Sequence, residues 1–468
     1  MNHDCHDAQS SRRRFFRHMA ALGGTALTLS PLGRLLAAAG DAAHPRSRGF
    51  GPLRAVRDLN TGLPLLHLPA GFSYVSFGWA NEPLADGTRC PPAHDGMGIV
   101  AADGDVLTLV RNHEVVKLTG AFGPPAAQYD PACAGGTVTL RFDTKAGRLL
   151  DARASLSGTL QNCGGGTTPW GSWLSCEEFV SGAGLSVLTR DGPTITRHDH
   201  GYVFEVPAQG LSDARPLRAM GQFRHEAATV HAPTGDVYLT EDAEPSAGFY
   251  RFVPTTPGKL ADGGKLWMLR AKDAPDLRSG LKIGQRWKVD WVEIAEPDQG
   301  YDSKTGSILG VQAQGFAQGA SRFTRLEGCI ADTDEVFFVA TNGGDTANGQ
   351  VFVYRPAGQE LQLIYESADP AVLDYPDNVV LSPRGGLVIC QDSSQERQHL
   401  YGLTRDGKLF EFARQAVVLD GAMGFSGDFR EAEWAGCCFS PDGRWLFANV
   451  YSPGFSVAIT GPWQDGLI

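Results

Sequence analysis

Acidic and amide side chains recur at the ends of β-rich segments of this 468-residue chain. Six segments each follow a turn rich in Gly or Asp and end in such a group. The end groups are Glu114, Glu177 with Glu178, Glu241 with Asp242, Asn342, Asp392 and Asn449. Flexible sites rich in oxygen ligands suit Ca²⁺, whereas a thiolate such as that of Cys176 favours iron or zinc. The pattern therefore indicates multivalent cations and leaves their identity open.

A second polar group opens the strand before each of these turns. The opening groups are Asp95, Asn162, Glu226, Glu327, Asp377 and Glu433. Glu226 precedes Glu241 by 15 residues (241 − 226), and Asp377 precedes Asp392 by the same interval. An antiparallel hairpin brings its two free ends together, so each opening group is expected beside its closing group. Six such hairpins around one axis predict an all-β fold, a six-bladed β-propeller.

Further strands fit between the predicted hairpins. Alternating apolar patterns, which are typical of half-buried strands, occur at 136–143, 201–207, 248–254, 349–356 and 407–413. Residues 258–318 are only weakly periodic, so we expect them to form an insertion over one face. Residues 40–468 are then expected to form a single propeller domain. A closed propeller leaves few free strand edges, which favours a monomer.

The predicted rim gathers more negative charge than its arginines can neutralise. Burying an unpaired ionised carboxylate is very costly, so protons or cations must compensate. Only Arg111, Arg224 and Arg325 occur within the same motifs. His113 and His225 are possible imidazole ligands, and Asn112 is a candidate to bind substrate. The candidate metal ligands are Glu114, Cys176, Glu177, Glu178, Glu226, Glu241, Asp242, Glu327, Asp377, Asp392 and Glu433.

The N-terminus has the pattern of an export signal. Three consecutive arginines at 12–14 precede two aromatic residues, an apolar run over 19–36 and three alanines at 37–39. A basic head, an apolar stretch and small residues at the cleavage site predict a signal peptide over residues 1–39. The paired arginines resemble a twin-arginine signal, so we expect contact with that export machinery and a periplasmic or secreted protein. No other stretch is long and apolar enough to predict a membrane span.

The overall charge also limits the partners. Lys and Arg number 41 against 52 Asp and Glu, which gives a formal net charge of −11. Binding of a nucleic acid backbone requires a surplus of basic residues, so nucleic acid is not expected as a partner. Metal ions can reverse the local sign of the field, so an anionic small molecule remains compatible with an acidic protein.

Several long motifs resemble the PhoX-type alkaline phosphatases. The most specific is the run from Asn162 to Glu178 (NCGGGTTPWGSWLSCEE). Shorter similar motifs begin at Arg111 (RNHE), Arg224 (RHE), Phe323 (FTRLEG) and Pro376 (PDN). The motifs at 439–443 (FSPDG) and 455–463 (FSVAITGPW) extend the resemblance over roughly residues 60–463.

This resemblance implies a six-bladed propeller that hydrolyses phosphomonoesters at iron and calcium ions in its central channel. It implies that Cys176 is the thiolate ligand of iron, and that Glu177, Glu226, Glu241 and Glu327 are carboxylate ligands. It also implies that Arg325 clamps the substrate phosphate and takes part in catalysis. A guanidinium fork matches phosphoryl oxygens and stabilises developing charge, which agrees with this role.

Two other functions are compatible with the residues alone. One is a calcium-stabilised propeller that serves as a binding platform, because propellers host many unrelated functions. The other is a propeller lactonase or related hydrolase that uses a single calcium ion. The acids outnumber what one ion needs, and Cys176 is a soft ligand, so the sequence favours the phosphatase.

Overall fold

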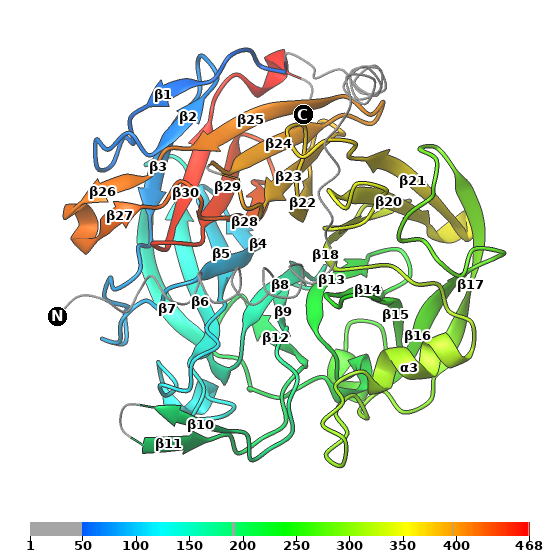
Figure 1. The fold of residues 1–468 in the computed structure, drawn as a ribbon. Helices are drawn as coiled ribbons and strands as arrows, with labels where there is room; N and C mark the ends of the chain where they lie inside the picture. The colour runs from blue at the N-terminus through cyan, green and yellow to red at the C-terminus, as the bar shows by residue number, and fades with distance from the viewer. Residues whose placement is uncertain (1–48, 190–191, 396, 467) are drawn as a thin grey trace, which may run out of the picture.

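The regular secondary structure of the described residues is almost entirely antiparallel β-sheet, in a propeller-like arrangement. This computed structural model describes residues 49–468 except 190–191, 396 and 467. Within those residues, five larger sheets surround a common centre (Figure 1), accompanied by two ribbons and the helix α3 (Gly310–Ala317). The predicted signal peptide over residues 1–39 and the first residues of the predicted domain lie outside this part of the chain. Among the described residues, no helix combines the length and the apolar character needed to cross a membrane.

Two of the sheets have four strands each. The first has the order β4 (His94–Asp103), β5 (Val106–His113), β6 (Gly135–Asp143) and β7 (Arg148–Thr159). The second has the order β28 (Trp434–Phe439), β29 (Trp445–Val450), β30 (Phe455–Thr460) and β3 (Ser73–Phe77). Its outer strand β3 pairs with β30 from Ser73↔Thr460 to Phe77↔Ser456. A segment near residue 75 therefore completes a sheet built from the last strands of the chain, which closes the ring.

The other two regular sheets have three and six strands. The three-stranded sheet has the order β12 (Val203–Pro207), β9 (Ser172–Glu177) and β8 (Asn162–Thr167). The six-stranded sheet contains β1 (Arg54–Val56), β2 (Leu66–Leu68), β25 (Leu409–Gln415), β24 (His399–Leu403), β23 (Leu387–Gln391) and β22 (Pro376–Leu381). The two ribbons are β10 (Ser186–Thr189) with β11 (Gly192–Ile195), and β26 (Val418–Asp420) with β27 (Ser426–Asp428).

The remaining sheet has nine strands and consists of two runs. One run is β13 (His225–His231), β14 (Asp236–Glu241), β15 (Phe249–Pro254), β16 (Gly264–Ala271) and β17 (Arg286–Ile294). The other is β18 (Leu326–Ala331), β19 (Val336–Ala340), β20 (Gln350–Arg355) and β21 (Glu360–Glu366). Only the three residue pairs from Arg286↔Gln362 to Lys288↔Glu360 join β17 to β21 and so fuse the two runs.

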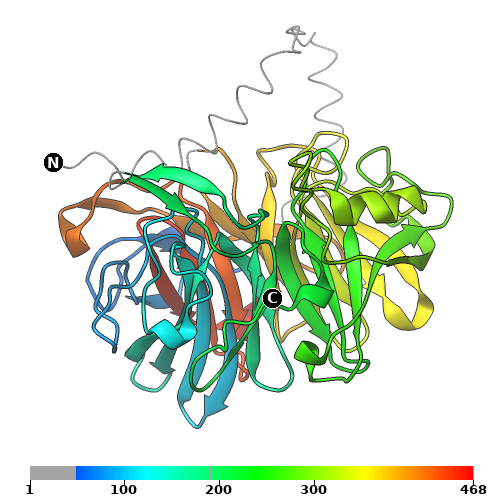
Figure 2. The ribbon, with the colours of Figure 1, turned by 90° about the horizontal axis from the view of Figure 1, so that it is seen from below.

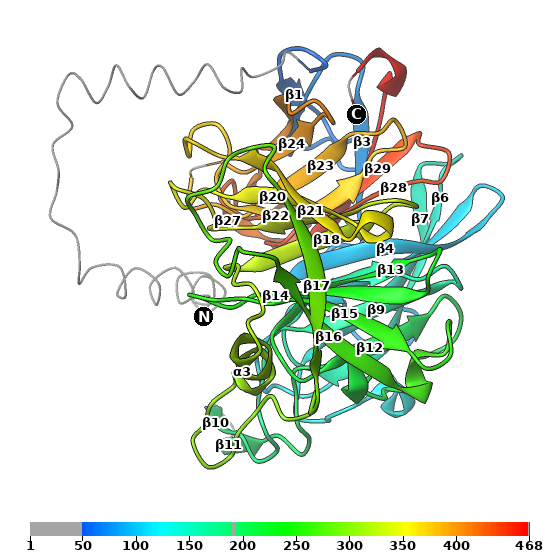
Figure 3. The ribbon, with the colours of Figure 1, turned by 90° about the vertical axis from the view of Figure 1, so that its right-hand side faces the viewer.

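The segment 258–318 differs from the expected insertion. Instead of crossing one face as an irregular excursion, it contributes the strands β16 and β17 to the nine-stranded sheet. In β17 the apolar residues Trp287, Val289, Val292 and Ile294 are buried, while lysine and acidic residues between them weaken the pattern in the sequence. The helix α3 lies outside the sheet and contacts β16 and β17 (Figure 3).

Six strands line the centre of the ring. Each of β4, β8, β13, β18, β22 and β28 contacts the next, and β28 contacts β4, so the inner strands form a closed circle (Figure 1). Figure 2 shows the same ring from the side. Each inner strand pairs in a hairpin with the strand that follows it, as the spacing of polar residues predicted. The open ends of the six hairpins, each formed by two strand ends, therefore lie around one axis.

Apolar clusters between neighbouring sheets hold the ring together. The buried strand β19 shows how, because its sequence is VFFVA and its side chains alternate between two faces. Phe337 and Val339 enter a cluster with residues of β22 to β25, whereas Phe338 enters another and stacks on Phe249, with ring centroids 4.1 Å apart. The run of strands that contains β19 thus packs on both faces.

Candidate metal centre

An irregularity in strand pairing follows the start of every inner hairpin. The register shifts between His94 and Met97, and equivalent shifts occur in the other five hairpins. The residues that begin these bulges are Asp95, Cys163, Glu226, Glu327, Asp377 and Gly436. Bulges re-aim side chains and are common beside active sites. Five of the six bulges therefore begin with a residue whose side chain can bind a metal.

Glycines behind these residues let the inner strands approach closely. A Cβ on Gly164, directly after Cys163, would collide with the carbonyl oxygen of Glu226 on the next inner strand. A Cβ on Gly328, directly after Glu327, would lie 2.6 Å from the carbonyl oxygen of Asp377. Because only glycine tolerates this contact, each donor residue is packed against the backbone of the next.

The donors form two groups that share Glu226. Ligand atoms of Cys163, Glu178 and Glu226 lie within 4.8 Å of one another, as do those of Glu226, Glu327 and Asp377. All but the half-buried Asp377 are buried. The Oε1 atom of Glu226 also accepts the backbone N–H of Gly164 at 3.1 Å, which fixes its orientation.

Burial and mutual repulsion disfavour the ionised forms of these groups. Burial, followed by the charges of Glu327 and Asp377, raises the pKa of Glu226 well above its ordinary value of 4.5. Burial and the neighbouring charges of Glu226 and Glu178 likewise raise the pKa of the Cys163 thiol. Such groups ionise in a buried site only when cations compensate them.

Four further predicted acids lie close enough to interact electrostatically with one another or with these groups: Glu114, Asp242, Asp392 and Glu433. Burial, then Asp392 and other acids including Asp377 and Glu114, raise the pKa of Glu433 well above its ordinary value. Asp242 is the exception, because Arg325 and Arg224 outweigh its burial and hold its pKa below the usual range. The acids of separate hairpins therefore act on one another across the centre of the ring.

Two arginines border the acids. Arg325 adopts a φ of +39°, an uncommon left-handed conformation for a long side chain. It donates from Nε to Oδ1 of Asp242 at 3.0 Å and from Nη2 to Oε1 of Glu327 at 2.7 Å. Arg224 donates to Oε1 of Glu178 at 3.0 Å and is about a third exposed. Arg111 lies elsewhere, because its buried guanidinium donates to Cys90 Sγ.

Two predicted carboxylate ligands are engaged by hydrogen bonds away from these groups. Glu177 accepts four of them, from the backbone N–H groups of Leu160, Gly201 and Tyr202 and from His200 Nδ1 at 2.7 Å. Glu241 accepts from Gly248 N–H, from the Tyr250 hydroxyl and from Gln312 of α3. Burial raises the pKa of Glu241 to about 7. Both carboxylates hold neighbouring loops in place.

Cys176 and Asn112 also occupy supporting positions. Cys163 and Cys176 are both buried in one apolar cluster with residues such as Leu174, but only Cys163 also has its ligand atom within 4.8 Å of those of Glu178 and Glu226. Asn112 donates to the carbonyl oxygens of Cys163 and Gly164, both at 2.6 Å, and accepts from Trp173 and Ser175. All the hydrogen-bonding groups of its side chain are therefore used to hold the β8 bulge.

The two histidines named with the acids also face other neighbours. His113 Nδ1 lies 3.1 Å from the carbonyl oxygen of Pro92, and His225 Nε2 lies 2.9 Å from that of Gly221. The candidate ligands named from the sequence did not include Cys163, which is grouped with Glu178 and Glu226, or Asp95, whose charge acts on Glu226. A signal for both exists in the sequence, because each directly precedes a glycine at the start of an inner strand, as Glu327 does.

The donor set fits multivalent cations. Buried carboxylates from different hairpins converge with one thiol, and their nearest basic groups are Arg224 and Arg325. Oxygen ligands suit calcium, and the thiol of Cys163 suits iron. Beyond the bulges, five of the six inner strands line a cavity of about 660 Å³ that continues along the centre of the ring.

Comparisons with solved structures give weak similarities. The β-propeller domain of Cps50 (Swd1) from Myceliophteria thermophila is 10% identical, with 78% of this chain and 82% of that chain covered and a TM-score of 0.34. A periplasmic gluconolactonase of Pseudomonas aeruginosa is 15% identical, with 88% and 92% covered and a TM-score of 0.36. These likenesses are too weak to support an argument about this chain. No curated protein matches.

The sequence pattern of a protein family gives a stronger result. The pattern of alkaline phosphatase PhoX matches residues 134–454, which include the bulges that begin at Cys163, Glu226, Glu327 and Asp377. The matched span covers more than half of the 468 residues. The chain belongs to the alkaline phosphatase PhoX family.

Proposed function

We propose that this protein hydrolyses phosphomonoesters at a centre of several iron and calcium ions in its central channel. The observation that supports this most is the pair of linked donor groups around Glu226, flanked by two arginines. When bound, such cations offset the charge of a phosphate ester and lower the pKa of a water molecule. The family assignment agrees with this chemistry.

The contacts assign different roles to the predicted ligands. Glu178, Glu226, Glu327 and Asp377 are the first candidates to hold the ions, with Cys163 in place of Cys176 as the thiolate ligand of iron. The acids that share their field complete the charge of the centre: Glu114, Asp242, Asp392 and Glu433. Glu177, Glu241 and Asn112 position the loops and bulges that carry these ligands.

Arg325 is the candidate to bind the substrate phosphate. Its hydrogen bonds to Asp242 and Glu327 use Nε and Nη2, and Nη1 takes no part in them. The guanidinium is therefore held by carboxylates on one side and can present N–H groups to a phosphoryl oxygen on the other. An oriented cation of this kind stabilises the charge that develops on the phosphoryl group.

The arrangement of the sheets supports a six-bladed propeller. We count the nine-stranded sheet as two blades, β13–β17 and β18–β21, because only three residue pairs join them. The other four larger sheets supply one blade each. On the basis of its N-terminal sequence, we also propose that the enzyme is exported by the twin-arginine route to the periplasm or the medium. We propose a monomer because a closed propeller leaves few free strand edges.

Elemental analysis and a phosphatase assay test the proposal together. The purified full-length protein is expected to contain iron and calcium and to hydrolyse a chromogenic phosphomonoester at alkaline pH. Calcium without iron, with no turnover, would support a binding platform. Hydrolysis of a lactone without hydrolysis of the phosphate ester would support the lactonase. Either of these results would refute the phosphatase.

A further inference from the structure

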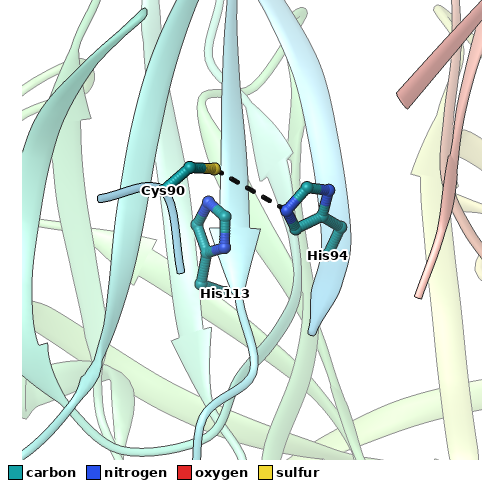
Figure 4. A group of neighbouring side chains, drawn as sticks. All are labelled: Cys90, His94 and His113. Atoms are coloured by element: carbon teal, nitrogen blue, oxygen red, sulfur yellow. Dashed lines mark hydrogen bonds between the residues drawn. The ribbon is translucent and has the colours of Figure 1, made fainter. Parts of the chain in front are cut away.

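A second cluster of metal-binding side chains lies behind the channel acids. His94 begins β4 and His113 ends β5, and the two residues are directly paired across the hairpin. Their sequence neighbours Asp95 and Glu114 belong to the acidic field at the centre, whereas the two imidazoles face Cys90 (Figure 4). Ligand atoms of Cys90, His94 and His113 lie within 4.8 Å of one another, and all three residues are buried.

His113 is oriented as a ligand, with one ring nitrogen held by a hydrogen bond and the other left without one. Its Nδ1 atom lies 3.1 Å from the carbonyl oxygen of Pro92, which only accepts, so the proton resides on Nδ1. Nε2 then carries a lone pair, and this buried atom has no hydrogen-bond partner. Histidines that bind metals commonly donate the other ring N–H to a backbone carbonyl in this way.

The other two residues complete a three-ligand set. His94 Nε2 lies 3.7 Å from Cys90 Sγ and 3.1 Å from the carbonyl oxygen of Pro91, to which it donates in the absence of an ion. To bind an ion through Nε2, His94 must carry its proton on Nδ1, a buried atom that has no hydrogen-bond partner. Cys90 Sγ also accepts an N–H from the buried Arg111 at 3.1 Å. A hydrogen bond from a fixed cation stabilises a thiolate, as outer contacts do in known metal sites. Two imidazoles and one thiol, which loses its proton when a metal binds, therefore converge with a carbonyl oxygen beside them.

The charge of the site selects the kind of ion. Cys90 supplies the single negative ligand, and the Arg111 guanidinium contacts the same sulfur atom. A divalent ion would add a net charge to a buried site beside another cation, which is costly. Because Arg111 already balances the thiolate, a divalent ion would leave two uncompensated positive charges and a monovalent ion only one. The monovalent ion therefore costs less, and soft thiolate ligands select copper(I).

We propose that Cys90, His94 and His113 form a binding site for one copper(I) ion, separate from the channel centre. A second Cys–His pair in the same protein supplies the contrast. Cys133 Sγ lies 3.5 Å from His200 Nε2, but His200 is held by Glu177 at 2.7 Å and lies 3.7 Å from Asp130. Since both nitrogens of His200 face carboxylates, that cluster is an ion-pair network and a matched control.

Anaerobic titration of the full-length protein with copper(I), against a chromogenic copper(I) chelator, tests the site. One copper(I) per chain is expected. Cys90→Ser and His113→Gln are expected to weaken its binding by at least about 100-fold, since even outer contacts cost 10- to 100-fold. Cys133→Ser is expected to leave the affinity unchanged, and the iron and calcium contents of Cys90→Ser should equal those of the wild type.

X-ray absorption at the copper edge of the wild-type protein keeps the test independent of how the variants fold. One sulfur and two nitrogen neighbours are expected. A spectrum without sulfur, or an affinity equal to that of Cys90→Ser, would overturn the proposal. Loss of copper in Cys163→Ser instead of Cys90→Ser would assign the ion to the channel and overturn it. Tight binding of zinc without copper(I) would overturn the choice of ion.

Discussion

Replacement of Glu226 by glutamine tests whether the acids of the channel repel one another. Glu226 belongs to both donor groups, and its carboxylate oxygen lies within 4.8 Å of ligand atoms of Glu327 and Asp377. Glutamine keeps an oxygen that can accept the N–H of Gly164, so the local backbone is preserved. The substitution Glu226→Gln therefore removes the charge with little change in shape.

The size of the effect follows from the distances. Two unit charges 4.8 Å apart repel by about 3.5 kcal/mol at an effective dielectric constant of about 20. Ionising Glu226 beside two ionised neighbours would therefore cost about 7 kcal/mol. Taking up a proton at pH 7 costs about 3.4 kcal/mol for a group with an ordinary pKa of 4.5. Without cations Glu226 is expected to be protonated, and Glu226→Gln should stabilise the metal-free protein by about 3 kcal/mol.

Urea unfolding followed by tryptophan fluorescence measures this change. The metal-free variant is expected to unfold at a higher urea concentration than the metal-free wild type. With iron and calcium present the order is expected to reverse, because the variant loses a ligand. The folded wild type has the raised pKa and binds more protons than the unfolded chain above pH 4.5. Its metal-free stability should therefore increase as the pH falls from 7 toward 4.5.

A matched control separates this effect from a general response to charge. Glu296 is exposed, and Glu296→Gln should leave the stability nearly unchanged with or without metals. If metal-free Glu226→Gln unfolds at a lower urea concentration than the metal-free wild type, the acids do not repel as their distances require. The argument for cations in the channel would then fail.

Three further changes probe the site and its support. Cys163→Ser should lose iron in elemental analysis, whereas Cys176→Ser should retain it; the opposite pattern would return the thiolate role to Cys176. Arg325→Lys should keep its metals but lower kcat/KM for a phosphomonoester by at least about 100-fold, and an unchanged value would exclude the guanidinium from catalysis. Although burial opposes it, Glu177 helps to raise the pKa of His200 to about 12. Wild-type stability in urea should thus decline as the pH rises above 6.5, and His200→Asn should show a flatter profile; equal profiles would contradict this.

Local sequence patterns were sufficient to predict the hairpins and the polar ends that they bring together. Alternation of apolar residues and turns rich in Gly and Asp specify a strand pair through contacts between neighbours in sequence. The interval of 15 residues from Glu226 to Glu241 predicted that both ends of the hairpin lie together. The observed pairing of His225 with Glu241 confirms this. The family resemblance was likewise readable from motifs, and the pattern of alkaline phosphatase PhoX confirms it.

Which side each donor faces was decided only by the tertiary structure. A shift of one residue turns a side chain to the opposite face of a strand, and the bulges introduce such shifts. Cys163 and Cys176 both flank acids or glycines in the sequence, and both pack in one apolar cluster, yet only Cys163 also joins the acids. The grouping of Cys90 with His113 likewise depends on strand pairing. Contacts between strands select these partners, and a linear sequence does not contain that selection in any local pattern.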